Sequence, residues 1–185
     1  RSPLGRAWRR ESHRKIGILP PKDQALAVRK VLTKRQWLDE KRVGIWGWSG
    51  GGSMSLNAVF KFPDLYQTAI AVASVPDQRH YDTIYQERYM GHPRENREGF
   101  EEGSPINFVQ NLKGNLLIIH GAADDNCHYQ TYLRLVDKLI EYNKTFSMMT
   151  YPRGTHSIRE GKNARRHLYG TMTRFLHDKM PPGPR

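Results

Sequence analysis

The sequence predicts an α/β fold in which helices cover both faces of a mainly parallel sheet. Four short runs are apolar throughout, which is typical of strands buried on both faces. Helix-length segments separate these runs, and crossovers of that length join neighbouring parallel strands. The predicted strands span residues 43–48, 68–75, 115–120 and 146–151.

Helical spacing of apolar residues predicts the segments between and around these strands. A helix is expected over residues 22–37, where Ala25, Val28 and Leu32 share a face, and another over residues 53–62, which stops at Pro63. The polar and aromatic segment 77–105 is expected to be a helical excursion. The clearest helix follows the third strand and the last one ends the chain; their apolar stripes are Tyr132, Leu135, Val136, Leu139 and Ile140, and Leu168, Met172, Phe175 and Leu176.

A chain of 185 residues is long enough for one domain with a real core and too short to promise two. Residues 1–20 are basic and end near Pro20-Pro21, so we expect an irregular lead-in loop there. Residues 21–185 are expected to form part of one α/β domain. We find no internal repeat and no low-complexity tract.

The formal net charge of +12 would suit an anionic partner if the basic residues shared one face. They are spread over the two ends and the flanks of the first long helix, and no nucleic-acid-binding motif accompanies them, so no nucleic-acid partner is expected. The single cysteine, Cys127, excludes an intrachain disulfide and a cysteine-based metal site. No run is long enough to span a bilayer, and the compartment, exported, periplasmic or cytoplasmic, stays open.

The turn after the first predicted strand fits the pattern G-x-S-x-G as Gly47-Trp48-Ser49-Gly50-Gly51. This pattern is typical of a sharp strand-to-helix turn that strains the serine backbone and exposes its hydroxyl, which leaves little room for side chains two residues away. In an open parallel sheet, ligands bind at the carboxyl ends of the strands, where Ser49 is expected. The alternative is that the glycines only permit close packing of helix and strand. A phosphate-binding loop is not favoured, because no Gly-Lys-Ser/Thr follows.

A serine needs a general base and an acid that orients the base before it can act as a nucleophile at neutral pH. Asp124 and Asp125 follow the third predicted strand, and His156 follows the fourth. The order serine, acid, histidine, each on a loop after a strand, is that of an α/β-hydrolase. The sequence therefore predicts the later half of an α/β-hydrolase sheet with Ser49, Asp124 and His156 at its rim. Asp125 is the alternative acid, and His120, at the end of a strand, is expected to be a buried structural histidine.

Four stretches, GIWGWSGGG, YDTIYQERYMG, LLIIHGAADDNCHYQ and YPRGTHSI, together resemble the catalytic domain of the dipeptidyl peptidase IV branch of the prolyl oligopeptidase family of serine peptidases. The resemblance covers residues 16–180 and implies that Ser49 is the nucleophile, Asp124 the acid and His156 the base. It also implies oxyanion stabilisation by the Gly50 N–H. The residues that it implies for substrate binding are Val75, Tyr81, Tyr85 and Asn126. For the two tyrosines, the spacing alone fits packing of a short helix equally well.

The chain departs from the family pattern at three positions. Gly50 stands where an aromatic residue is common, Gln78 where a tryptophan is common, and Cys127 where an aliphatic residue is typical. A pocket without two large rings is expected to be wider, so a strict preference for proline before the cleaved bond does not follow. The resemblance also implies an amino-terminal β-propeller, early hydrolase strands and a second oxyanion donor that this chain lacks, and a possible homodimer.

The expected activity is hydrolysis of peptide substrates near the amino terminus, after proline or alanine, by acyl transfer without a metal or organic cofactor. An acyl-peptide hydrolase or esterase with the same triad is the nearest alternative. A catalytically idle relative that acts as an interaction module is another.

Overall fold

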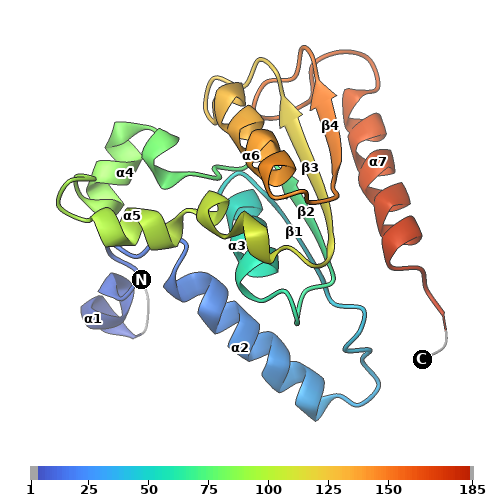
Figure 1. Cartoon of the computed structure of the whole chain (residues 1–185), viewed down its shortest axis with the longest axis horizontal. Coiled ribbons are helices and arrows are strands. Elements are labelled where there is room, and N and C mark those ends of the chain that lie inside the picture. Colours follow the sequence, from blue (N-terminus) through green and yellow to red (C-terminus); the bar gives the residue numbers. More distant parts are fainter. Residues whose placement is uncertain (1–3, 184–185) are drawn as a thin grey trace.

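The computed structural model describes residues 4–183 of the chain. Its elements follow the expected alternation of strands and helices (Figure 1). In chain order they are α1 Gly5–Arg10, α2 Leu19–Lys34, β1 Gly44–Trp48, α3 Gly50–Lys61, β2 Thr68–Val72, the 3₁₀ segment η1 Gln78–His80, α4 Thr83–Met90, α5 Arg97–Gly103, the 3₁₀ segment η2 Pro105–Asn111, β3 Asn115–Gly121, α6 Tyr129–Glu141, β4 Ser147–Tyr151 and α7 Ala164–Lys179.

The strands form one sheet in the order β1-β2-β3-β4, and every neighbouring pair is parallel. The prediction of a parallel sheet with flanking helices is therefore confirmed. The register pairs Ile70 of β2 with Leu117 of β3, so side chains at matching positions fall on the same face. All strands run in one direction, and the loops that follow them meet at one rim.

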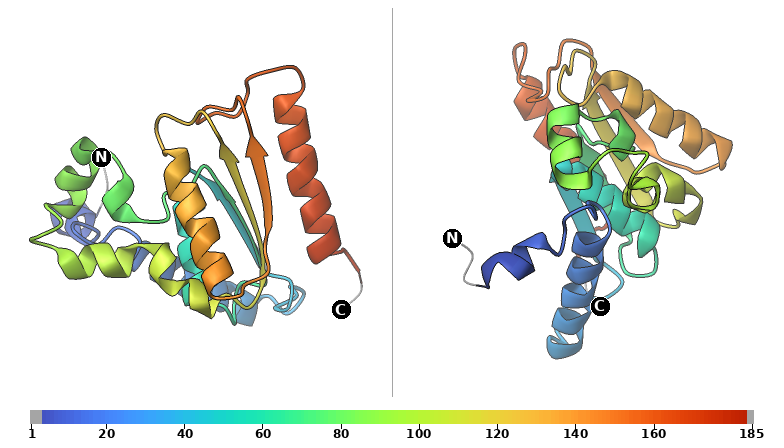
Figure 2. Two further views of the ribbon diagram at one scale, coloured as in Figure 1. Left: turned by 45° about the horizontal axis from the view of Figure 1, so that its top comes forward. Right: turned by 90° about the vertical axis from the view of Figure 1, so that its left-hand side faces the viewer.

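Two apolar layers hold the sheet between its helices. On one face, Leu56 and Phe60 of α3 and Leu135 of α6 pack in one cluster with Leu116 and other residues of β2 and β3. On the other face, α7 supplies the cover through Leu168, Met172 and Phe175. Figure 2 shows the sheet between α6 and α7. The strained turn and the loops of the rim thus rest on a framework that is buried from both sides.

Several boundaries differ from the sequence-based expectation. Helix α2 begins at Leu19 rather than residue 22, because prolines are accepted in the first turn of a helix, where their missing N–H groups would have no intrahelical partner. It ends at Lys34 rather than residue 37, and Trp37 beyond it is 70% exposed. Strand β2 ends at Val72 rather than residue 75, because Ala73 turns to a φ of 46° that no strand tolerates.

The expected lead-in loop over residues 1–20 was wrong in part. Residues 1–3 lie outside the described residues, but Gly5–Arg10 forms the short helix α1 and Leu19 already belongs to α2. Alanine and arginine are good helix formers, which favours α1 without an apolar face. Helix α3 likewise begins at Gly50 instead of residue 53, because the turn at Ser49 passes directly into it.

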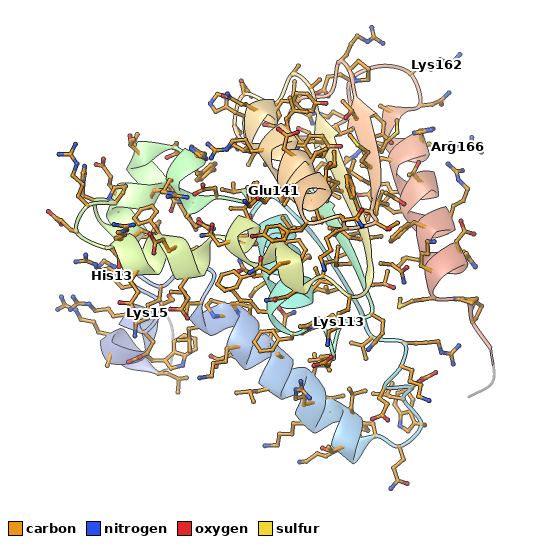
Figure 3. The ribbon with its side chains drawn as sticks, in the orientation of Figure 1. His13, Lys15, Lys113, Glu141, Lys162 and Arg166 are labelled. Carbon is orange, nitrogen blue, oxygen red and sulfur yellow. The ribbon has the colours of Figure 1, made fainter. Side chains whose placement is uncertain are left out.

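The surface and the sheet edges of the described residues add three facts. Within residues 4–183, β1 pairs only with β2, and Trp46 on this edge strand is 56% exposed. Of the labelled basic side chains, Lys162 and Arg166 lie near each other at the start of α7, whereas Lys15 and Lys113 lie in other parts of the molecule (Figure 3), so these four form no common basic face. No helix among the described residues is long and apolar enough to cross a bilayer.

Candidate active site

Ser49 occupies the sharp turn between β1 and α3 in a strained conformation. Its φ is 57° and its ψ −120°, a region that non-glycine residues rarely adopt. Its backbone N–H donates to the Val72 carbonyl at 2.8 Å, which ties the turn to β2. Gly47 is needed here, because a Cβ at this position would clash with the backbone of Gly51.

The steric reason expected for a glycine at position 51 was wrong. A Cβ on Gly51 would meet nothing within 4 Å, whereas a Cβ on Gly52 would meet the Val72 carbonyl oxygen at 2.7 Å. The close approach on the helix side of the turn therefore falls one residue later than the sequence pattern indicates. Gly50 also has open space around its missing side chain.

The loops after β3 and β4 bring an acid and an imidazole together. His156 Nδ1 lies 2.9 Å from Asp124 Oδ2. A carboxylate only accepts hydrogen bonds, so Nδ1 carries the proton and Nε2 is left with its lone pair. The neighbouring Asp125, which the sequence left as an alternative, is exposed, and the carboxylate that bonds His156 Nδ1 is that of Asp124. The structure thus selects Asp124 as the partner of His156.

Asp124 is a buried residue, with 4% of its surface exposed, and its carboxylate is hydrogen-bonded by the protein. Its Oδ1 accepts the backbone N–H groups of Asn126 at 3.0 Å and Cys127 at 2.9 Å. Burial raises the pKa of Asp124, but hydrogen bonds from His120, His156 and these two N–H groups outweigh it and lower the pKa to about 2. The carboxylate is therefore charged at every pH at which the protein is expected to work.

His120 is the buried histidine that the sequence indicated. It is fully buried, and its Nε2 lies 2.7 Å from the Cys127 carbonyl and 3.4 Å from Asp124 Oδ2. Because the carbonyl only accepts, Nε2 carries the proton. His120 thereby fixes the position of the segment that contains Asp124.

The Ser49 hydroxyl is not hydrogen-bonded to His156 in the described structure; its side chain interacts with the Cys127 thiol instead. Burial, and then the charge of Asp124, raise the pKa of the Cys127 thiol to about 12. The thiol therefore stays protonated and is a poor nucleophile beside Ser49. Hydrogen bonds between catalytic groups are often completed only when substrate binds.

Cys127 also belongs to a group of potential metal ligands with Asp124 and His156, whose ligand atoms lie within 4.8 Å of one another. A metal would need the thiolate, and the raised pKa of Cys127 opposes its formation. In addition, Asp124 Oδ2 is hydrogen-bonded to the imidazole of His156. The arrangement suits proton transfer better than metal binding.

Two contacts hold the loop that carries His156. The indole N–H of Trp48, the residue before Ser49, donates to the His156 carbonyl at 2.9 Å. Within the loop, the Glu160 carboxylate accepts the Thr155 N–H at 2.9 Å and the Thr155 hydroxyl at 2.6 Å. The loop of the candidate base is thus attached to the strand of the candidate nucleophile.

A cavity of about 330 Å³ opens beside Ser49. Val75, Tyr81 and Tyr85 line it, and Tyr85 is 44% exposed, so the two tyrosines lie at a cavity wall rather than in the core. Their rings meet edge to face with centroids 5.5 Å apart. Gly50 and Gln78, the two positions without the expected rings, also line this cavity.

A larger and more polar hollow of about 920 Å³ lies on the other side of Tyr81, which lines both. Asn126 and Asp125 line this hollow and do not line the Ser49 cavity. The structure therefore brings Asn126 next to Tyr81, at the mouth of the site, and not into the cavity beside the hydroxyl.

Sequence reasoning missed a set of residues that shape this cavity. Ile16, Gly17 and Pro20 of the lead-in segment line it, together with Ser53 and Asn57 of α3. No local pattern marks the first three, because they reach the site only through tertiary packing. Ser53 and Asn57 carry a usable signal, since they follow Ser49 at i+4 and i+8 and so share its helix face in an otherwise apolar segment.

Comparisons with known proteins agree with this geometry. The chain is 37% identical over 172 residues to the venom dipeptidyl peptidase 4 of Vespa velutina, covering 91% of this chain and 22% of the relative. It is 39% identical over 181 residues to dipeptidyl aminopeptidase A of Saccharomyces cerevisiae, covering 94% of this chain and 19% of the relative. The crystal structure of Porphyromonas gingivalis dipeptidyl peptidase 4 superposes with a TM-score of 0.91 at 38% identity, over 95% of this chain and 25% of that chain.

The chain thus spans about a fifth to a quarter of the length of these relatives. The superposition identifies the four-stranded sheet and its helices as part of an α/β-hydrolase domain. The family model of the prolyl oligopeptidase family matches residues 2–182. The chain therefore belongs to the prolyl oligopeptidase family, in the branch of the dipeptidyl peptidases 4.

Proposed function

We propose that this chain carries the catalytic triad of a serine exopeptidase of the dipeptidyl peptidase IV type, which releases dipeptides from the amino terminus of peptides. The single observation that carries the proposal is the His156 Nδ1 to Asp124 Oδ2 hydrogen bond of 2.9 Å at the same sheet rim as the strained Ser49. The names of the similar proteins support the peptidase chemistry.

In the proposed reaction, His156 Nε2 takes the Ser49 proton while Oγ forms a bond to the carbonyl carbon of the substrate. Charge that develops on the carbonyl oxygen is stabilised by the backbone N–H of Gly50, at the amino end of α3, where the first N–H groups have no intrahelical acceptor. His156 then gives the proton to the leaving amine as the C–N bond breaks. Water, activated by the same imidazole, hydrolyses the acyl-enzyme.

The remaining roles concern the substrate. Val75, Tyr81 and Tyr85 are proposed to contact the residue before the cleaved bond, because they line the cavity beside Ser49. Asn126 is proposed to hold a carbonyl of the preceding residue, from its position in the neighbouring hollow next to Tyr81. A second oxyanion donor and the groups that recognise the substrate amino terminus are proposed to lie in parts of the parent protein beyond this chain.

A fluorophosphonate probe tests the nucleophile in the protein of full natural length. We expect labelling that Ser49→Ala abolishes, and turnover of a Gly-Pro anilide that falls about 10⁶-fold in the same variant. Turnover of simple acetyl esters without turnover of the Gly-Pro anilide would indicate an esterase. A full-length protein that the probe does not label would contradict the proposal.

A further inference from the structure

The wall of the cavity beside Ser49 contains a buried acceptor without a partner. Asn57 is fully buried on α3 and lines the cavity. Its Nδ2 donates to the Ser53 carbonyl at 3.1 Å and to the Gly103 carbonyl at 3.3 Å, so the orientation of the amide is fixed. Its Oδ1 has no hydrogen-bond partner in the described structure. Buried polar atoms are usually hydrogen-bonded, so this unpaired acceptor calls for an explanation, and a bound ligand is one that its place in a cavity wall favours.

Gln78 adds a donor to the same cavity. Its carbonyl and its Oε1 both accept from Gln86 Nε2, at 2.7 and 2.6 Å, which fixes the side-chain oxygen away from other partners. Among the described residues, no acceptor bonds Gln78 Nε2. The residue is buried and lines the cavity with Asn57. The cavity thus offers one free acceptor and one free donor.

The charge of the cavity narrows the choice of ligand. None of the described residues that line it is charged. An ammonium or carboxylate group buried in this cavity would have no counter-charge, which is far more costly than burying a neutral amide. The free acceptor and donor match a neutral group that can both donate and accept.

The length of the side chain follows from the helix. Asn57 is eight residues beyond Ser49, which corresponds to about 12 Å along α3 at 1.5 Å per residue. Side chains of a helix lean toward its amino end, which brings the Asn57 amide back toward the hydroxyl. A side chain with two methylenes before its amide reaches farther from the cleaved bond toward Asn57 than proline or alanine does.

We propose that this pocket accepts, immediately before the cleaved bond, a long neutral side chain that ends in an amide, with glutamine as the probe. The glutamine NH₂ donates to Asn57 Oδ1, and its carbonyl accepts from Gln78 Nε2. The absence of a side chain at Gly50, where a Cβ would meet nothing within 4 Å, leaves the entrance open. This inference rests on the proposed peptidase function and names the substrate class of the same site.

The test compares Gly-Gln, Gly-Met and Gly-Pro p-nitroanilides with the full-length protein. Methionine has a similar length to glutamine but no amide, so the ratio of kcat/KM for glutamine over methionine isolates the hydrogen bonds. We expect a ratio of about tenfold or more in the wild type, the value of one net hydrogen bond. Asn57→Leu is expected to bring the ratio to one or below, because it removes the acceptor for the glutamine amide.

The matched control is Asn111→Leu, the same change at an exposed position outside the cavity, which should leave the ratio unchanged. If Asn57→Leu fails to fold, the wild-type ratio and Gln78→Leu decide the question. Labelling of Ser49 and turnover of Gly-Pro with equal rates for glutamine and methionine would overturn this inference alone. Failure of labelling and of all three substrates would overturn the peptidase function and the pocket with it.

Discussion

Replacement of Asp124 by asparagine removes the charge that organises the acid loop and its imidazole. The carboxylate accepts hydrogen bonds from His156 Nδ1 and from the N–H groups of Asn126 and Cys127, and His120 Nε2 lies 3.4 Å from its Oδ2. An amide has only one oxygen, so its NH₂ must face either an imidazole N–H or two backbone N–H groups. The imidazole can accept from the amide if its proton moves from Nδ1 to Nε2. Nε2 then has no lone pair with which to take the Ser49 proton.

The magnitude follows from the environment of the carboxylate. A carboxyl group whose pKa falls from 3.8 to about 2 is stabilised in its charged form by about 2 kcal/mol in the folded protein. We expect Asp124→Asn to lower the free energy of unfolding by about 2 kcal/mol. We expect kcat to fall about 10⁴-fold, the size of this effect in serine proteases when the orienting carboxylate is replaced.

The assay uses a Gly-Pro anilide with the full-length protein and follows unfolding in urea by tryptophan fluorescence. Asp125→Asn is the matched control, since it makes the same change at the exposed neighbouring residue and should keep kcat within about threefold. The reasoning would be refuted if Asp124→Asn kept more than a tenth of the wild-type kcat. It would also be refuted if Asp125→Asn lost as much activity as Asp124→Asn.

Three further predictions concern acid stability, the strained turn and the histidine loop. The pKa of Asp124 is lower in the folded than in the unfolded protein, so the stability that Asp124 contributes is present above about pH 4 and is lost as the pH falls toward 2. The urea midpoint, measured at pH 7, 4 and 2.5, should therefore decline less steeply in Asp124→Asn than in the wild type. Gly47→Ala forces a Cβ into the backbone of Gly51 and should lower the free energy of unfolding by about 3 kcal/mol or more in thermal unfolding. Gly51→Ala places its Cβ in open space at a helical position, so it should be neutral or stabilising by up to about 1 kcal/mol. Equal losses in the two variants would contradict the steric argument. Trp48→Phe removes the 2.9 Å hydrogen bond to the His156 carbonyl and should lower kcat about tenfold with little change in KM. The control is Trp46→Phe, which changes an exposed indole and should have the kinetics of the wild type.

The parts of the molecule that the sequence predicted are those fixed by local patterns. Continuous apolar runs separated by helical crossovers admit few arrangements other than a buried parallel sheet, so the parallel direction of the strands could be predicted, whereas their order in the sheet comes from the structure. The carboxyl ends of parallel strands share one rim, so residues after β1, β3 and β4 could be expected near one another. The structure brings Asp124 to His156, and it resolves the choice between Asp124 and Asp125, which depends on the local turn and not on the pattern.

Local patterns failed where backbone geometry departs from the rule that the residue type suggests. Pro20 and Pro21 indicate a loop by their residue type, but prolines are also compatible with the first turn of α2. The apolar run predicts a strand as far as Val75, but the backbone leaves the strand conformation at Ala73. In both cases the residue type is compatible with two structures, and the packing of its neighbours decides between them.

Local sequence patterns could not predict the cavity beside Ser49. Two features of this cavity lower the stability of the protein, and a function in binding and catalysis explains them best. An unpaired acceptor such as Asn57 Oδ1 costs about 1–3 kcal/mol when it is buried, and a leucine at this position would avoid that cost. The strained backbone of Ser49 adds a further cost of about 1–3 kcal/mol in the same cavity wall. Both features destabilise the free protein: the strained backbone exposes the hydroxyl for its proposed reaction with a carbonyl, and the acceptor is proposed to bond an amide of the substrate. Their occurrence on one face of α3 therefore argues that binding and chemistry in this cavity, rather than the packing of the helix, determine which residues stand there.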